Sequence, residues 1–145
     1  MKRHPALVAL SHDHHHEFVQ ARRLVRAADA SADERLEAAR AYVELFFTET
    51  VRHFRDEEET LFPVYARRAG ETPVLQRILR EHMELHGLVR ALRAQVAGGD
   101  VDPERLRTLG DLLREHVRVE ERELFPAIEA ALTEQELEEL EIKVE

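Results

Sequence analysis

The sequence predicts an all-α fold: an up-down-up-down antiparallel four-helix bundle with a short C-terminal helical segment. Apolar residues recur every three or four positions through four long stretches, which is the period of an amphipathic helix. Residues typical of helix starts and ends separate these stretches, and no stretch alternates with the two-residue period of a strand. Short connections between long helices favour antiparallel neighbours. We expect one domain over residues 1–145, a length that can bury a real core.

The first expected helix opens at Pro5 and ends near Asp29, because proline is well tolerated in a first helical turn. Its expected apolar stripe is Leu7, Leu10, Phe18, Ala21 and Val25. The second begins at Ser31, and Glu34 three residues later completes a capping-box signal. Pro63 removes a backbone donor and clashes with the preceding turn, which predicts a kink or break near Phe62. A short helical piece should continue to Gly70.

The third and fourth helices have similar start signals. Residues 72–73 (Thr-Pro) open the third helix, which should stop at the glycine pair 98–99. Residues 102–103 (Asp-Pro) open the fourth, and Pro126 interrupts it as Pro63 interrupts the second. Thr133 then caps a short, acidic fifth segment.

Composition excludes several classes of partner. The formal net charge of −9 argues against a nucleic-acid surface or an anionic membrane, since neither is attracted to an acidic protein. No apolar run is long enough to span a bilayer, and the apolar stretch near the N-terminus is too short for a signal peptide. We therefore expect a soluble cytoplasmic protein. The chain has no cysteine and nine histidines, so any metal must be held by nitrogen and oxygen.

An internal repeat carries the candidate chemistry. Residues 53–63 read HFRDEEETLFP and residues 116–126 read HVRVEERELFP, so both copies hold His-x3-Glu before Leu-Phe-Pro. In each copy the histidine and the glutamate lie one turn apart on one helix face. The two motifs therefore predict equivalent places on the second and fourth helices.

Heptad spacing turns these side chains toward the bundle core and selects one histidine from the run HDHHH on the first helix. The candidate site residues are His14, His53, Glu57, His82, His86, His116 and Glu120. The remaining histidines of the run, His12, His15 and His16, are expected at the surface. Buried imidazoles and carboxylates need compensation, which a cation would supply. A buried His–Glu hydrogen-bond network without metal is the alternative.

Five imidazoles and two carboxylates exceed the three or four protein ligands of a usual zinc site and suit two transition ions in a bundle core. If both glutamates bridge the ions together with one solvent-derived ligand, one ion has six ligands and the other five. The open position would take a small ligand such as O2, NO or peroxide.

With these motifs the chain resembles the hemerythrin-like family, the His-His-Glu (HHE) cation-binding domains, over essentially its whole length. The resemblance implies a non-haem diiron centre with an oxo or hydroxo bridge. One iron would be held by His82, His86 and His116 and the other by His14 and His53, with Glu57 and Glu120 bridging. Oxygen-carrying hemerythrins have an aspartate five residues after the last histidine, which falls here on Glu121, so Glu121 stays open as the alternative to Glu120. Manganese and zinc stay open as alternatives to iron.

Three hypotheses about function follow. The first is binding or sensing of O2 or NO at the open iron. The second is an enzyme that acts on peroxide or a small oxidisable substrate, for which Tyr42, Tyr65, Glu58 and Glu121 are proton-donor candidates by residue type. The third is an interaction module that responds to iron loading. The oligomeric state is left open.

Overall fold

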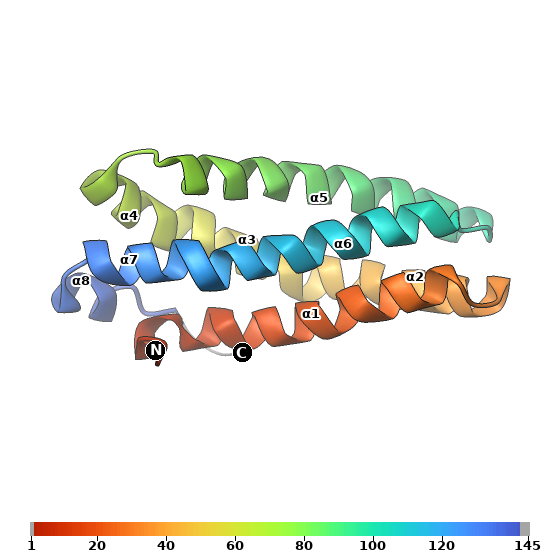
Figure 1. Ribbon diagram of the computed structural model, residues 1–145, viewed down its shortest axis with the longest axis horizontal. Coiled ribbons are helices and arrows are strands. Elements are labelled where there is room, and N and C mark those ends of the chain that lie inside the picture. The colour runs from red at the N-terminus through yellow and green to blue at the C-terminus, as the bar shows by residue number, and fades with distance from the viewer. Residues whose placement is uncertain (1, 143–145) are drawn as a thin grey trace.

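The computed structural model describes residues 2–142, which form four helical rods and a short final helix without strands (Figure 1). The first rod joins a 3-10 turn, η1 (Pro5–Leu7), to α1 (Val8–Ala28). The second runs through α2 (Ala32–Leu45), η2 (Phe46–Thr50), α3 (Val51–Asp56), η3 (Glu57–Leu61) and α4 (Phe62–Ala69). The third is α5 (Pro73–Gly98). The fourth comprises α6 (Pro103–Val119), η4 (Glu120–Leu124) and α7 (Phe125–Ala131), and α8 (Glu134–Glu138) follows.

Consecutive rods run antiparallel, with their connections at alternate ends of the bundle (Figure 1). The loops from α1 to α2 and from α5 to α6 lie at one end, and the loop from α4 to α5 lies at the other. The predicted up-down-up-down bundle is therefore confirmed. No helix within residues 2–142 combines the length and apolar character needed to cross a membrane.

Ser31 and Thr133 cap their helices as the sequence predicts, whereas the side chain of Thr72 makes no capping hydrogen bond at the start of α5. The Ser31 hydroxyl accepts a hydrogen bond from the backbone N–H of Glu34 at 3.2 Å, which satisfies a donor at the start of α2. Thr133 and Glu136 form a reciprocal capping box at the start of α8. At the other end of α5, Gly99 takes a left-handed conformation with φ of 79°, which side chains disfavour.

The two internal prolines widen the helices without ending them. Pro63 follows the π-helical turn η3, and Pro126 follows the π-helical turn η4, so each rod continues in helical form past its proline. A proline ring clashes with the carbonyl four residues earlier, and in both rods that residue lies inside the widened turn. The sequence predicted a kink or break near Phe62 followed by a short helical piece to Gly70. A π turn precedes Phe62 in place of a break, and the short helical piece is α4, which continues to Ala69.

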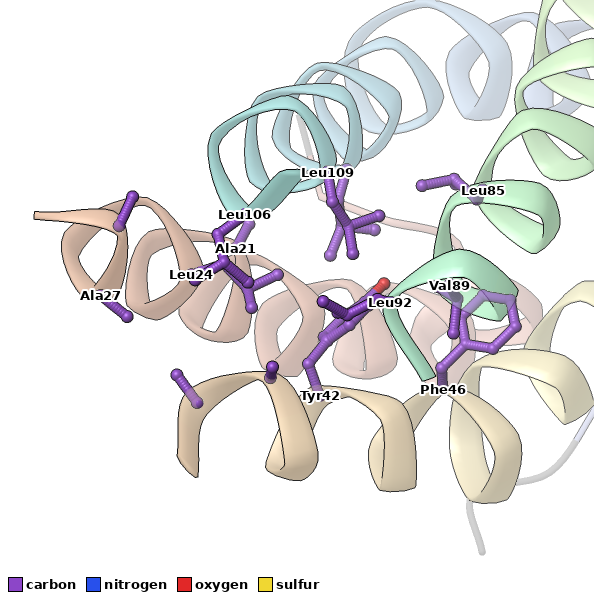
Figure 2. Close-up of a cluster of buried hydrophobic side chains, with 14 of the residues drawn as sticks. Ala21, Leu24, Ala27, Tyr42, Phe46, Leu85, Val89, Leu92, Leu106 and Leu109 are labelled. Atoms are coloured by element: carbon purple, nitrogen blue, oxygen red, sulfur yellow. The ribbon is translucent and has the colours of Figure 1, made fainter. Parts of the chain in front are cut away.

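Two apolar clusters fill the bundle, one toward each end. Figure 2 shows the first, in which Tyr42, Leu92 and Leu109 from three rods approach one another. The second cluster contains Leu10, Leu61, Ile78, Leu124 and Phe125 among others. Along every rod a buried polar residue lies in sequence between the members of these two clusters, which places one polar layer across the middle of an otherwise apolar core.

One part of the predicted stripe on the first helix is wrong. Phe18 is 38% exposed, whereas its neighbour Glu17 is buried. The buried face of α1 runs through His14, Glu17, Ala21 and Leu24, in steps of three and four. The observed buried face includes Glu17 in place of Phe18, one residue earlier in the chain. One residue corresponds to about 100° around a helix, so the core contains a carboxylate where a phenylalanine was expected.

Rods one and four pack closely because α6 has a glycine at the contact. A Cβ added to Gly110 would lie 2.7 Å from Val25 Cγ2 and 2.8 Å from the Ala21 carbonyl oxygen. This approach sets the spacing between the rods that carry His14 and His116.

Candidate metal centre

Six buried side chains from all four rods meet in the polar layer. They are His14 on α1, His53 on α3, Glu57 in η3, His82 on α5, His116 on α6 and Glu120 in η4. They form two groups, and within each group the candidate ligand atoms all lie within 4.8 Å of one another. One group contains His14, His53, Glu57 and Glu120, and the other contains His82, His116 and Glu120. Glu120 belongs to both.

Both glutamates stand at the first residue of a π turn. The backbone N–H of Phe62 donates to the carbonyl of Glu57, and that of Phe125 donates to the carbonyl of Glu120, five residues apart in each case. A π turn inserts one extra residue into a helix, and such turns are frequent at functional sites. The π turn begins at the glutamate of each His-x3-Glu unit, so the helix spacing of histidine and glutamate is kept. The leucine and phenylalanine that follow in each rod pack in the second cluster.

The carboxylate oxygens point at the inward nitrogen atoms of the histidines. Glu120 Oε2 lies 2.7 Å from His14 Nε2, and Glu120 Oε1 lies 3.2 Å from His116 Nε2. Glu57 Oε2 lies 3.4 Å from His53 Nε2, and its Oε1 lies 3.3 Å from His82 Nε2. Each carboxylate thus faces histidines of both groups.

These inward atoms lack hydrogen-bond partners. The Nε2 atoms of the four histidines and both oxygens of each glutamate are fully buried, and none makes a hydrogen bond of acceptable geometry among the described residues. Buried polar atoms are rarely left so, because each costs about 1–3 kcal/mol. Imidazole nitrogen and carboxylate oxygen are ligands of transition ions, so a bound cation would satisfy all of them together. The residues present therefore fit a metal centre.

Each of the four histidines is hydrogen-bonded through its outer nitrogen to a further carboxylate. Nδ1–H donates from His14 to Glu121 (2.5 Å), from His53 to Asp13 (3.1 Å), from His82 to Glu58 (2.6 Å) and from His116 to Glu81 (2.9 Å). A carboxylate behind a histidine fixes the ring orientation and tautomer and makes the opposite nitrogen a better donor to metal. The lone pair on every Nε2 is thereby directed into the layer.

The electrostatics of the layer favour bound positive charge. Burial alone would lower the pKa of His14, but the adjacent Glu120 carboxylate raises it to about 10. Burial would likewise lower the pKa of His82, but the neighbouring carboxylates of Glu120, Glu57 and Glu58 raise it to about 11. Burial and repulsion from Glu120 raise the pKa of Glu57, whereas neighbours that include His116 hold the pKa of Glu120 well below its ordinary value. In the absence of metal, the histidines of the cluster therefore retain protons, and a bound metal ion would displace them.

Aromatic rings enclose the histidines. Phe54 stacks on His82 with 3.7 Å between ring centroids, and Phe125 stacks on His14 at 5.2 Å. Phe125, a member of the second apolar cluster, thus also lies directly against the centre. These rings help keep bulk water from the inward atoms.

Two predicted or alternative ligands lie outside the groups. His86 is partly exposed, and its ring packs edge-on against Phe46 and Phe54 at 5.1 and 5.8 Å. Burial lowers its pKa. Its role as a ligand stays a prediction. Glu121 accepts hydrogen bonds from Ser11 Oγ and from His14 Nδ1, the nitrogen opposite the inward Nε2. Glu121 therefore belongs to neither group.

Sequence reasoning missed several functional side chains. Asp13 and Glu81 each precede a candidate ligand in the chain, a signal that could have drawn attention to them, but each pairs with a histidine on another rod. Glu17 was also missed, and within residues 2–142 both of its buried oxygens lack a hydrogen-bond partner. Among the same residues, the buried hydroxyl groups of Tyr42 and Thr50 lack one too. Glu17 lies seven residues from both Leu10 and Leu24, a heptad spacing that could have marked it as internal.

Comparison with known families agrees with this geometry. Residues 6–128 match the family described as hemerythrin HHE cation binding domain, a range that contains all six clustered side chains. No curated protein and no solved structure matches the chain significantly. The match spans most of the chain and the buried His/Glu cluster provides the expected cation ligands, so the protein belongs to the hemerythrin HHE cation-binding domain family.

Proposed function

We propose that the polar layer holds two iron ions and that the protein binds a small ligand there. The observation that carries this proposal is the set of inward Nε2 and carboxylate atoms without hydrogen-bond partners. His14 and His53 would hold one ion and His82 and His116 the other, with Glu57 and Glu120 bridging and a solvent-derived oxo or hydroxo ligand between the ions. Manganese or zinc would fit the same donors. That residues 1–145 work as one cytoplasmic domain stays a prediction from the sequence.

The placement of His86 bears on the ligand count. With two imidazoles for each ion, two bridging carboxylates and one bridging oxygen, neither ion reaches six ligands. His86 would complete one of them only after its ring turns away from Phe46 and Phe54. Positions for a small molecule such as O2, NO or peroxide therefore remain on either assignment. When bound, a diiron pair supplies an electron-rich centre for such ligands, and the protein supplies the apolar surroundings that exclude water.

The test is optical spectroscopy of protein loaded with ferrous iron under anaerobic conditions. Addition of O2 or NO should produce new ligand-to-metal absorption in the wild type. His53→Ala should reduce it, because His53 belongs to the buried cluster, whereas His15→Ala, at an exposed position outside both groups, should not. Absence of any new band in a preparation that contains the iron would refute ligand binding while leaving the metal site intact.

A second candidate is an enzyme that disproportionates peroxide. Glu17 and Tyr42 favour it, because both are buried and have oxygen atoms that lack hydrogen-bond partners among residues 2–142. The charge of Glu17 acts on His53 of the cluster and on the Tyr42 hydroxyl. Burial and the charge of Glu17 raise the pKa of Tyr42 well above its ordinary value, so its hydroxyl keeps its proton. Conversion of two H2O2 into two H2O and O2 needs protons to move between bound molecules but no further reductant, and a buried carboxylate can accept and return them.

Peroxide consumption measured over many equivalents separates the two candidates. If the enzyme hypothesis holds, Glu17→Gln should slow turnover while the iron content stays unchanged, and Glu37→Gln, an exposed control, should have no effect. Loss of only stoichiometric amounts of peroxide, with bleaching of the centre, would refute it.

A further inference from the structure

A second pair of histidines lies on the exposed side of α1, one turn apart. His12 and His16 are separated by four residues, and their ring centroids lie 4.8 Å apart with the ring planes at 58°. Both side chains are exposed, and neither belongs to the buried groups. Residues four apart on a helix are neighbours on its surface, so the two rings can turn their nitrogen atoms toward one point.

A carboxylate from the second rod lies beside His16. Glu49, in the π turn η2, places Oε2 3.9 Å from His16 Nδ1. This separation is too long for a hydrogen bond. Metal–nitrogen and metal–oxygen bonds are about 2.0–2.2 Å each, so two ligands of one ion lie roughly 3–4 Å apart, which matches the observed separation. The side chains of His16 and Glu49 are 48% and 44% exposed, so both are free to adjust.

We propose that His12, His16 and Glu49 form a second, surface metal site that takes a first-row divalent ion such as zinc or copper(II). Two imidazoles and one carboxylate suit these ions, and water would complete the coordination. The chain offers them no thiolate competitor, and its net charge of −9 attracts cations. The bound ion would join α1 to η2 and so tie the first two rods together beside the buried centre. The proposal does not depend on what the buried centre binds.

The adjacent His15 provides a matched control. It is exposed and belongs to the same run of histidines, but its ring lies 6.3 Å from that of His16, and no carboxylate is placed beside it in the described structure. If the site is built as proposed, His15 is dispensable. If exposed histidines bind ions merely because they are numerous, His15 is as important as the others.

The experiment is a titration of iron-loaded protein with zinc by isothermal calorimetry, with iron content measured before and after. Wild type and His15→Ala should bind one more zinc ion than a His12→Ala/His16→Ala variant. Either single change, His12→Ala or His16→Ala, should weaken this binding by at least about tenfold, because one of two imidazole ligands is lost. Glu49→Gln should weaken it by a smaller factor. Zinc binding should also raise the melting temperature of the wild type and not of the double variant.

Copper(II) provides an independent readout. Electron paramagnetic resonance of the iron-loaded wild type with one equivalent of copper should show coupling to two nitrogens, reduced to one in His16→Ala. Equal zinc affinity in wild type and the double variant would overturn the proposal. So would an equal loss in His15→Ala, which would indicate diffuse binding by the histidine run. All the substitutions are at exposed positions, and circular dichroism checks that helicity is unchanged.

Discussion

Glu81 should control metal affinity although it lies outside the cluster of inward atoms. Its carboxylate is only 6% exposed and accepts a hydrogen bond from His116 Nδ1 at 2.9 Å. Arg77 Nε donates to its other oxygen at 3.1 Å, which holds the carboxylate in place. Despite burial, which would raise it, the pKa of Glu81 is lowered by His116 and Arg77. A charged acceptor is therefore fixed behind His116.

The size of the effect follows from this geometry. Loss of a carboxylate behind a metal-binding histidine costs about 10–100-fold in affinity, or about 1.4–2.7 kcal/mol. Glu81→Gln keeps a hydrogen-bond acceptor and loses only the charge, so we expect the lower value. Glu81→Leu removes both and should approach the upper value. Glu58, behind His82, is 42% exposed, so Glu58→Gln should have a smaller effect because water screens its charge.

Competition with a chromogenic chelator under anaerobic conditions measures the affinity for ferrous iron or zinc in each variant. Glu84→Gln is the matched control, an exposed acid on the same helix α5. Wild-type affinity in both Glu81→Gln and Glu81→Leu, with normal helicity, would show that the outer carboxylates do not support the centre.

Three further predictions concern stability. Gly110→Ala should lower the free energy of unfolding by about 1–2 kcal/mol, because overpacking against α1 outweighs the gain in helix propensity. Gly87→Ala should stabilise the fold slightly, because no atom lies within 4 Å of the added Cβ. Thermal melting of the two variants tests this difference. Ser31→Ala should cost about 1 kcal/mol in urea unfolding through loss of the cap on α2, and an unchanged midpoint would contradict this. In metal-free protein the pKa of His14 is raised to about 10 and that of His82 to about 11. These raised pKa values stabilise the fold fully below the unfolded-state pKa near 6.5, and the stabilisation is lost as the pH rises through the folded-state values. The melting temperature should therefore fall between about pH 7 and 11, and it should fall less in metal-loaded protein.

Much of the fold was predictable because its signals are local. The capping residues Ser31 and Thr133 act on backbone groups three positions away, so their role is visible in the sequence. The π turns were not predictable, because Pro63 shows that the backbone ladder is disturbed but not how the preceding turn will adjust. The error at Phe18 has a similar cause: hydrophobicity favoured phenylalanine over Glu17, and packing around the polar layer decided otherwise.

The candidate site divides along the same line. Heptad spacing selects His14 from four nearby histidines, and the structure buries it while His12, His15 and His16 stay exposed. The pairing of outer acids with histidines was beyond sequence reasoning, because it joins different rods. Asp13 precedes His14 in the chain and yet pairs with His53. Such contacts depend on how the helices are rotated against each other, which one sequence does not specify.

Metal content per chain tests the central claim most directly. Protein purified without added metal, or loaded anaerobically with ferrous iron, should contain about two irons per chain. A Glu57→Ala/Glu120→Ala variant should contain almost none, because both groups lose their shared carboxylate. Absence of metal from the wild type even after anaerobic loading would contradict the account and leave the layer as a hydrogen-bonded network of buried histidines and glutamates.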